Sequence, residues 1–296
     1  MSTATTLLTK HALVETGDFA VEDVECRCGS ARWSPPEQSL AYGIVFVRSG
    51  CFHRLLNGIE TFVDSTVAYF ERPGDEQQIS HLAGGDSCTA VYLSARLLAS
   101  VHGGEEWLPD RTVRTTPALD LRHRLLLGLV GSGSDEAEAA EAVVALVADL
   151  LDESDPKPVA SGRPATALAR RRAVAVAREV LCEHPTAGVL ELARRAAVSP
   201  HHLSRVFKAE TGETISRYRN RLRVRLALER LAEGEPCLAR LAADLGFSDQ
   251  AHLSRVVRAE LGDPASHLRA QLMASGLHSG GRRRPTTPGR AVSSSS

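Results

Sequence analysis

The chain has 296 residues, enough for two ordinary domains that each bury a hydrophobic core. Its formal net charge is only −1, but residues 1–160 carry 12 Lys and Arg against 24 Asp and Glu, whereas residues 161–296 carry 23 against 12. This segregation favours a second half that binds a polyanion over a merely solvated surface. The N-terminus lacks an apolar run long enough for a signal peptide or a membrane span, and the six cysteines include no CxxC pair. We therefore expect reduced thiols in a cytoplasmic protein.

Residues 1–104 are predicted to form a small β barrel. Residues 1–40 hold short extended pieces, and runs rich in Val, Ile, Tyr, Phe and Thr follow from residue 41 to residue 94. Closely spaced short strands with turn residues between them indicate a barrel or a sandwich. Asn57-Gly58 is the strongest hairpin signal, since both residues tolerate a positive φ. The expected strands span 42–48, 51–56, 61–63, 67–71 and 88–94, and the other expected turns are Ser49-Gly50, Pro73-Gly74 and Gly84-Gly85.

Residues 105–154 are predicted to be helical. Apolar residues recur at helical spacing over 119–130 and 136–151, with a Gly- and Ser-rich break at 131–134. Two interpretations of these apolar faces stay open: an exposed stripe that serves as a dimer interface, or a cover for the barrel. Residues 155–165 are polar, contain Pro and Gly and lack periodicity, which is typical of an interdomain linker.

Residues 166–273 contain a segment that is written twice. HLSRVFKAETG at 202–212 returns as HLSRVVRAELG at 252–262. Each copy predicts two short helices joined by a tight turn, with a polar and basic outer face on the second helix, which is a helix-turn-helix. A continuous helix over 214–233 should hold the copies apart, so that both second helices enter successive major grooves about 34 Å apart. The expected helices span 167–183, 189–197, 201–210, 238–245 and 250–260.

The pattern LARRAAVSPHHLSRVFKAETGETISRYRNRLRVRLAL, followed by LARLAADLGFSDQAHLSRVVRAELGDPASHLR, resembles the AraC/XylS family of bacterial transcription regulators. The resemblance covers roughly residues 168–272 and departs at Val257 and His267, where the family usually has Phe and Tyr. It implies two domains: an N-terminal, mainly β, cupin-like effector-binding barrel with trailing helices, and a C-terminal all-α tandem helix-turn-helix joined by a long helix. In the barrel the resemblance rests on four residues: Gly50, Gly58, Pro73 and Gly74.

The family's base-contacting positions map onto the outward residues of the two recognition helices. An Arg can bind guanine as a bidentate fork, and a Gln can pair with adenine. For Arg205 and Arg255 the alternative is a phosphate contact or a surface salt bridge, and for His202 and His252 it is packing or capping. About two of the arginines at 217, 219, 221, 223 and 225 should reach phosphate. The predicted DNA-binding residues are His201, Ser204, Arg205, Gln250, Ala251, His252, Ser254 and Arg255.

We therefore expect a sequence-specific DNA-binding transcription factor, cytoplasmic and nucleoid-associated, that regulates transcription in response to an unidentified small molecule. The expected partners are double-stranded promoter or operator DNA, RNA polymerase and the small-molecule effector, with no membrane partner; a homodimer is left open. The alternative is a cupin-type metal-dependent oxygenase or isomerase with a DNA-binding appendage. It would need three or four convergent ligands, and the His-x-His pair expected after Gly50 is missing. A third hypothesis is redox sensing through Cys26 and Cys28.

No metal site, cofactor or catalytic residue is predicted. The spacing of the candidate ligands does not demand an ion, and single His and Cys residues on strands are more often packed than ligating. We expect a mainly apolar barrel pocket with a few polar groups for an organic effector. The alternative is a barrel that serves only for dimerisation or as a scaffold. Residues 274–296 are predicted to be a disordered basic and Ser-rich tail. The candidate ligands considered are His53, His81, Cys26, Cys28, Cys51 and Cys88.

Overall fold

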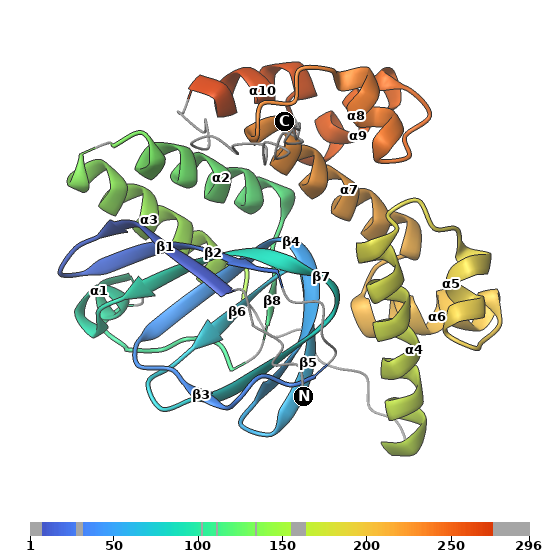
Figure 1. Cartoon of the computed structure of the whole chain (residues 1–296), viewed down its shortest axis with the longest axis horizontal. Helices are drawn as coiled ribbons and strands as arrows, with labels where there is room; N and C mark the ends of the chain where they lie inside the picture. The colour runs from blue at the N-terminus through green and yellow to red at the C-terminus, as the bar shows by residue number, and fades with distance from the viewer. Residues whose placement is uncertain are drawn as a thin grey trace, which may run out of the picture.

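The computed structural model describes residues 8–27, 32–101, 103–110, 112–133, 135–154 and 164–274. Its first half is mainly β with three trailing helices, and its second half is entirely helical, so the predicted fold class is confirmed (Figure 1). Most of the predicted linker, the predicted tail beyond residue 274 and Cys28 lie outside the described ranges. None of the described helices combines the length and apolarity that a membrane crossing requires.

Within the described residues, eight strands form one antiparallel sheet in the order β1-β2-β7-β4-β6-β8, with β3 paired to β7 and β5 paired to β4. The first half of β4 pairs with β6, and its second half pairs with β5. The strands span β1 (Leu8–Glu15), β2 (Phe19–Cys26), β3 (Glu37–Gln38), β4 (Tyr42–Leu56), β5 (Ile59–Asp64), β6 (Val67–Glu71), β7 (Glu76–Leu93) and β8 (Val113–Arg114).

The two longest strands, β4 and β7, each contain a glycine that the sequence placed in a turn. Gly50 and Gly85 have φ angles of 80° and 77°, and the β4–β7 register shifts on both sides of Gly50. A left-handed glycine serves a β-bulge as well as a turn, and a bulge bends the strand. The turns predicted at Ser49-Gly50 and Gly84-Gly85 were therefore wrong. The hairpin at Asn57-Gly58 is confirmed, with φ angles of 47° and 82°.

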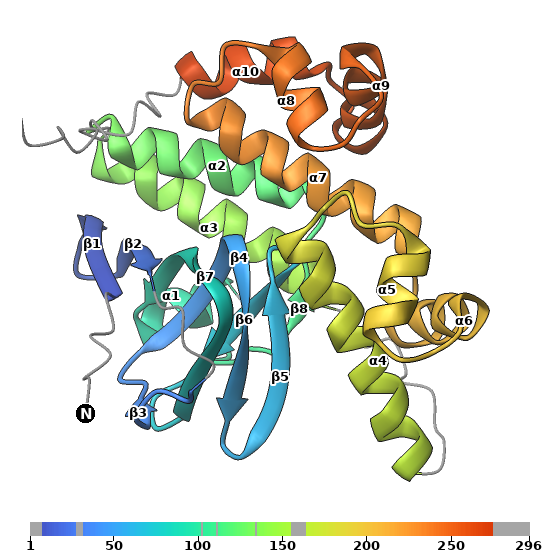
Figure 2. The same cartoon turned by 45° about the vertical axis from the view of Figure 1, so that its right-hand side comes forward.

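The helix α1 (Ala95–Val101) lies between β7 and β8 in the chain, and the helices α2 (Pro117–Gly131) and α3 (Glu136–Asp152) follow β8 (Figure 2). The apolar face of α3, including Val143, Val147 and Leu150, is fully buried in one cluster with strand residues of the barrel. Leu121 and Leu125 of α2 pack instead against the core of the last helices. The apolar face of α3 thus covers the barrel, as one interpretation predicted, whereas Leu121 and Leu125 of α2 cover the core of the last helices instead.

The second half contains two small hydrophobic cores joined by one helix. Leu192, Leu203 and Phe207 belong to the first core, and Leu241 and Leu253 belong to the second, all of them fully buried. The helices span α4 (Pro164–Glu183), α5 (Val189–Arg195), α6 (Pro200–Thr211), α7 (Ile215–Ala232), α8 (Leu238–Asp244), α9 (Gln250–Leu261) and α10 (Ala265–Ala274).

A buried ionic contact joins the barrel to the second half. Asp64, at the end of β5, is fully buried and lies 2.7 Å from the Arg178 guanidinium of α4. The Tyr218 hydroxyl of α7 donates a hydrogen bond to the same carboxylate. We call Asp64, Arg178 and Tyr218 the interdomain junction. Burial alone would raise the pKa of Asp64, but Arg178, Thr66 and Tyr218 outweigh it and hold that pKa below its usual value.

A second set of contacts ties α7 to the segment that precedes α2. Arg221 donates to the backbone carbonyl oxygen of Thr115 at 2.6 Å, and Arg225 donates to the same oxygen and to the Thr115 hydroxyl. Arg225 is fully buried, and Arg124 of α2 forms an ion pair with Glu229 of α7. Because charge-assisted bonds in a buried setting are strong, these contacts fix α7 against the first half.

His53 of β4 supplies a pH-dependent contact to α4. Its Nε2 lies 2.9 Å from Glu179 Oε1 and its Nδ1 lies 2.8 Å from Glu60 Oε1. The bond to Glu179 raises the pKa of His53 above its usual value against the opposing effect of burial. A raised folded-state pKa adds stability that is complete below the unfolded pKa and is lost as pH rises through the folded pKa. His53 is thus engaged with two carboxylates.

His53→Gln should lower the free energy of unfolding by more at about pH 5 than at about pH 9. The reason is that only protonated His53 attracts both carboxylates. Urea unfolding at the two pH values measures this difference. His11→Gln serves as the control, because His11 lies on an exposed part of β1. A difference that is independent of pH would contradict an ionic role for His53.

Candidate nucleic-acid interface

The first helix-turn-helix consists of α5 and α6. Ser199 caps α6 by accepting a hydrogen bond from the His202 amide at 3.2 Å, and Pro200 follows at the first helical position. Gly212 ends the helix with a φ of 75°. Val206 and its apolar neighbours are buried, so the opposite face of α6 points to solvent. Leu190 of α5 fits the helical periodicity of the apolar residues Leu192 and Ala193, which predicts an inward position, but it is 72% exposed.

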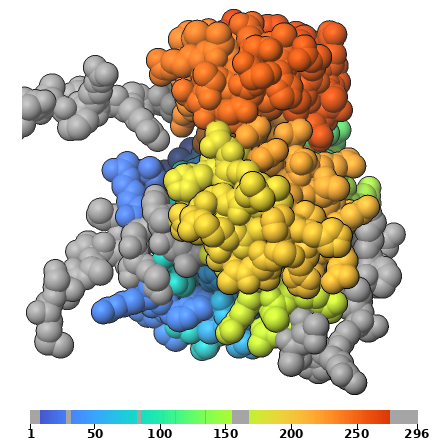
Figure 3. Space-filling view, turned by 90° about the vertical axis from the view of Figure 1, so that its right-hand side faces the viewer, coloured from blue at the N-terminus to red at the C-terminus, as the bar shows by residue number. Residues whose placement is uncertain are grey.

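The second unit, α8 and α9, repeats this construction with different capping chemistry. Asp249 Oδ1 accepts a hydrogen bond from the His252 amide at 2.6 Å, and Gly262 ends α9 with a φ of 83°. The turn is anchored by Phe247, which is buried in the second core. Figures 1 and 2 place α6 and α9 on the same side of the molecule, near the two ends of α7. Figure 3 shows the second half as a continuous surface on that side.

The structure brings the predicted DNA-binding residues onto the outer faces of the two recognition helices. Ser254 and His252 are half-buried, and the others are exposed. The exposed residues are His201, Ser204 and Arg205 on α6, and Gln250, Ala251 and Arg255 on α9.

Arg205 and Arg255 occupy equivalent places in the two copies, and both are exposed. Among the described residues, neither guanidinium forms an ion pair with a carboxylate, which removes the surface salt bridge as an explanation for these two. Arg205 Nη2 lies 3.4 Å from Nδ1 of His202. By contrast, Arg194 and Arg195 of α5 both pair with Glu191. Arg205 and Arg255 therefore remain available for a nucleic acid.

His252 has local partners that account for its position. Its Nδ1 lies 3.1 Å from the Ser248 hydroxyl oxygen, and its ring packs edge-on against Phe247 at 5.4 Å between centroids. These contacts support the packing and capping interpretation of His252, whose backbone amide also completes the Asp249 cap.

The arginines of α7 mostly serve structure, contrary to the expectation that about two would reach phosphate. Arg221, Arg223 and Arg225 are buried. Arg223 donates to the Pro185 carbonyl oxygen at 2.9 Å, and Arg219 donates to the Ala187 carbonyl oxygen. Only Arg217 among the five is exposed. Alternation along a helix puts successive arginines on different faces, and here several of those faces are interior.

Two further cations extend the outer faces of the recognition helices. Lys208 of α6 and Arg258 of α9 are exposed and stand in equivalent places of the two copies. Neither is among the DNA-binding residues predicted from the sequence, and the 50-residue offset of the repeat is the pattern that relates them. Both lie in the last turn of their helices, which is also a favourable place for a cation in the helix dipole.

Two capped helix-turn-helix units on one connecting helix define a tandem helix-turn-helix domain. Residues 192–271 match the family model HTH_18, described as "Helix-turn-helix domain". This C-terminal part of the chain is a helix-turn-helix domain of the AraC type.

A similar protein is the HTH-type transcriptional regulator Rv1931c of Mycobacterium tuberculosis, which is 46% identical over 57 residues. The match covers 19% of this chain and 22% of that protein, so the chain spans about a fifth of the curated relative that it matches.

Among solved structures, ToxT from Vibrio cholerae with a bound unsaturated fatty acid matches 88% of this chain and 98% of its own, with 10% identity and a TM-score of 0.34. The Cnp3 cupin domain of Schizosaccharomyces pombe matches 35% of this chain and 80% of its own, with 14% identity and a TM-score of 0.27. Both TM-scores lie below 0.5.

Proposed function

We propose that this protein is a transcription factor of the AraC/XylS type that binds a specific DNA sequence and responds to a small molecule in its barrel. The observation that carries the proposal is the matched pair Arg205 and Arg255, exposed on two capped recognition helices and without a carboxylate partner among the described residues. A guanidinium in that position can bind O6 and N7 of a guanine in the major groove. Gln250 adds a side chain suited to adenine.

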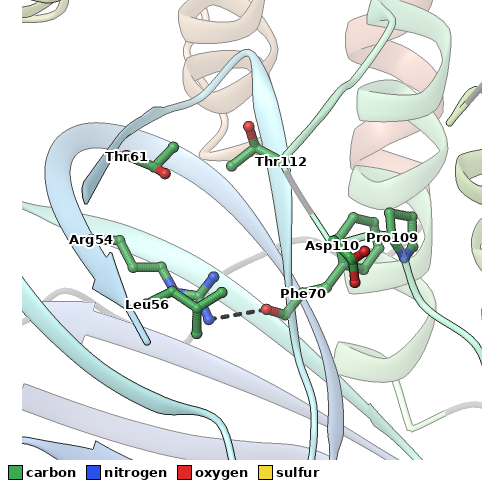
Figure 4. Close-up of a pocket in the computed structure, with 7 residues that line it drawn as sticks. All are labelled: Arg54, Leu56, Thr61, Phe70, Pro109, Asp110 and Thr112. Carbon is green, nitrogen blue, oxygen red and sulfur yellow. Dashed lines mark hydrogen bonds between the residues drawn. The ribbon is translucent and has the colours of Figure 1, made fainter. Parts of the chain in front are cut away.

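The barrel holds a cavity of about 330 Å³, which lies within the range for a small-molecule site. Its lining combines aromatic side chains with a few polar groups, among them Phe52, Tyr69, Tyr92 and Glu71. A second hollow near Arg54 has a volume of only about 30 Å³, room for little more than water (Figure 4). There the Arg54 guanidinium donates to the Phe70 carbonyl oxygen at 3.0 Å. The larger cavity is thus the proposed effector site.

The junction offers a route from that cavity to DNA. The proposed mechanism is that an effector with different affinities for two arrangements of the halves shifts the population that fits DNA. The arrangement described here is fixed by Asp64 with Arg178 and by Thr115 with Arg221. We further propose that the protein acts in the cytoplasm at the nucleoid, together with RNA polymerase. A dimer would need a surface other than the apolar faces of α2 and α3, which are covered.

The first experiment is selection of bound sequences from random duplex DNA with the full chain. The full chain is needed because Leu121 and Leu125 complete the second core. Enrichment of two short blocks about 10 base pairs apart would support two recognition helices that bind in successive grooves. Binding without sequence enrichment, lost as salt rises, would overturn the proposal and leave only an electrostatic contact.

On the selected site, Arg205→Ala and Arg255→Ala should each weaken binding by about 1–3 kcal/mol and relax the base preference locally. Lys208→Ala and Arg258→Ala are the matched controls from the same helices. If these two cations contact phosphate, their loss weakens binding to all sequences alike and lowers the salt slope by about 1. Equal losses on specific and random DNA for the Arg205 and Arg255 variants would assign those residues to phosphate as well.

A further inference from the structure

Three residues of metal-ligating type meet at the wall of the barrel cavity. Cys26 ends β2, and His81 and Asp86 lie on β7, the strand that pairs with β2. All three are buried, with 4%, 8% and 8% of their surfaces exposed, and all three line the cavity. One ligand atom from each lies within 4.8 Å of the other two. No part of the proposed DNA interface uses this cluster.

The distances suit one shared ion. Cys26 Sγ lies 3.9 Å from His81 Nδ1. Zinc bonds of about 2.3 Å to sulfur and about 2.0–2.1 Å to nitrogen add up to more than that separation, so an ion can bond both atoms with an angle between the bonds. The Asp86 carboxylate forms a hydrogen bond with Nε2 of the same ring. Because Cys26 and Asp86 face different nitrogens of the His81 ring, binding all three groups to one ion requires that the ring rotate about its Cβ–Cγ bond and release the hydrogen bond to Asp86.

The backbone and a neighbouring thiol position the three groups. A Cβ on Gly85 would lie 2.0 Å from the Cys26 carbonyl oxygen, so only glycine lets β7 approach β2 this closely. Cys88 Sγ donates to the second Asp86 oxygen at 3.0 Å. Such outer hydrogen bonds are what hold metal ligands in place.

We propose that Cys26, His81 and Asp86 bind one zinc-type divalent cation inside the barrel. A thiolate, an imidazole and a carboxylate form a mixed soft and hard set that suits Zn²⁺ better than Mg²⁺ or Ca²⁺, which prefer oxygen ligands alone. Three protein ligands leave a fourth position, and the cavity lies beside it. A water molecule or a Lewis-basic group of a small ligand fits that position.

The sequence predicts no metal here because the spacing of the His and Cys candidates does not demand an ion and Asp86 is not among those candidates. Of the other candidates, His53 is paired with Glu60 and Glu179. Cys28 lies outside the described residues. The proposed site is thus built from neighbouring strands, without the His-x-His arrangement whose absence argued against a metal.

The test is titration of the full chain with Co²⁺ in the presence of a phosphine reductant, after removal of bound metal by a chelator. We expect one Co²⁺ per chain, with thiolate-to-Co²⁺ charge-transfer absorption that Zn²⁺ abolishes by displacement. Cys26→Ser should lose that absorption. His81→Gln and Asp86→Asn should lose more affinity than Cys88→Ala, for which a decrease of about 10–100-fold is expected because Cys88 only orients Asp86.

Cys237→Ser is the matched control, since it removes an exposed thiol of the second half and should leave Co²⁺ binding unchanged. Absence of the charge-transfer band in the wild type, or its full persistence in Cys26→Ser, would overturn the proposal. If Cys26→Ser fails to fold by circular dichroism, His81→Gln decides in its place. Operator binding by the same preparations separates the two proposals, because protein that binds no Co²⁺ but still selects a DNA sequence counts against the metal site alone.

Discussion

Replacement of Arg178 by methionine should lower the free energy of unfolding by about 3–5 kcal/mol, because it leaves the Asp64 carboxylate fully buried without its cation. Methionine keeps an apolar stem against Phe62, whose ring lies 4.7 Å from the guanidinium. The expected value lies near the lower end of that range, since Tyr218 still donates to Asp64. Urea unfolding followed by circular dichroism measures the loss.

Arg172→Met, on an exposed position of the same helix, is the control and should change stability little. Asp64→Asn in the Arg178→Met background should regain part of the loss, because the buried group is then neutral. The lowered pKa of Asp64 adds stability above the unfolded pKa that is lost as pH falls through the folded pKa. The gap between wild type and Arg178→Met should therefore narrow in acid. Equal stabilities of the Arg178 and Arg172 variants would refute the junction.

Gly85→Ala should be the most destabilising addition of a single methyl group in the barrel. We expect it to lower the free energy of unfolding by about 3 kcal/mol or more. The φ of 77° strains any L side chain by about 1–2 kcal/mol, and overpacking adds about 1–3 kcal/mol. The clash partner is a backbone oxygen, which cannot rotate away. The free energy of unfolding from denaturant titration tests this expectation, and we also expect weaker Co²⁺ binding because β2 must move from β7.

Gly74→Ala provides the comparison for Gly85→Ala. Its φ is 88°, but nothing lies within 4 Å of an added Cβ, so only the backbone strain of about 1–2 kcal/mol applies. The difference between the two variants isolates the close approach to Cys26. Equal losses in the free energy of unfolding for the two variants would mean that β7 does not approach β2 tightly. The close approach could then not be what positions Cys26 beside His81 and Asp86.

The repeated segment allowed most of the second half to be predicted. Capping residues such as Ser199 and Asp249, and glycines such as Gly212, mark helix ends through local chemistry that a sequence displays directly. Periodicity was less reliable for short helices, as the exposed Leu190 demonstrates. The hairpin at Asn57-Gly58 could be read for the same local reason, whereas a glycine in a bulge has the same composition as one in a turn.

What the sequence could not give were contacts between distant residues. Arg221 and Arg225 look like DNA-binding cations, and only the position of Thr115 reveals that they bind its carbonyl oxygen instead. Likewise Cys26 and His81 are 55 residues apart, and their meeting depends on the register of β2 with β7. Partner choice by a charged side chain is a tertiary property, so its residue type alone does not decide it.

Because Leu121 and Leu125 of α2 pack against the second core, the protein does not divide cleanly at the linker. The chain crosses from one half to the other after residue 154, but the hydrophobic boundary lies between the two faces of α2. A C-terminal fragment cut at the linker would expose an apolar patch on its second helix-turn-helix. A fusion of that fragment to the sensor domain of another protein would lack the same contact with α2. A helix-turn-helix domain that is moved to another protein must therefore bring a substitute for α2. The substitute is either a grafted helix or polar substitutions of the core residues that α2 would have covered.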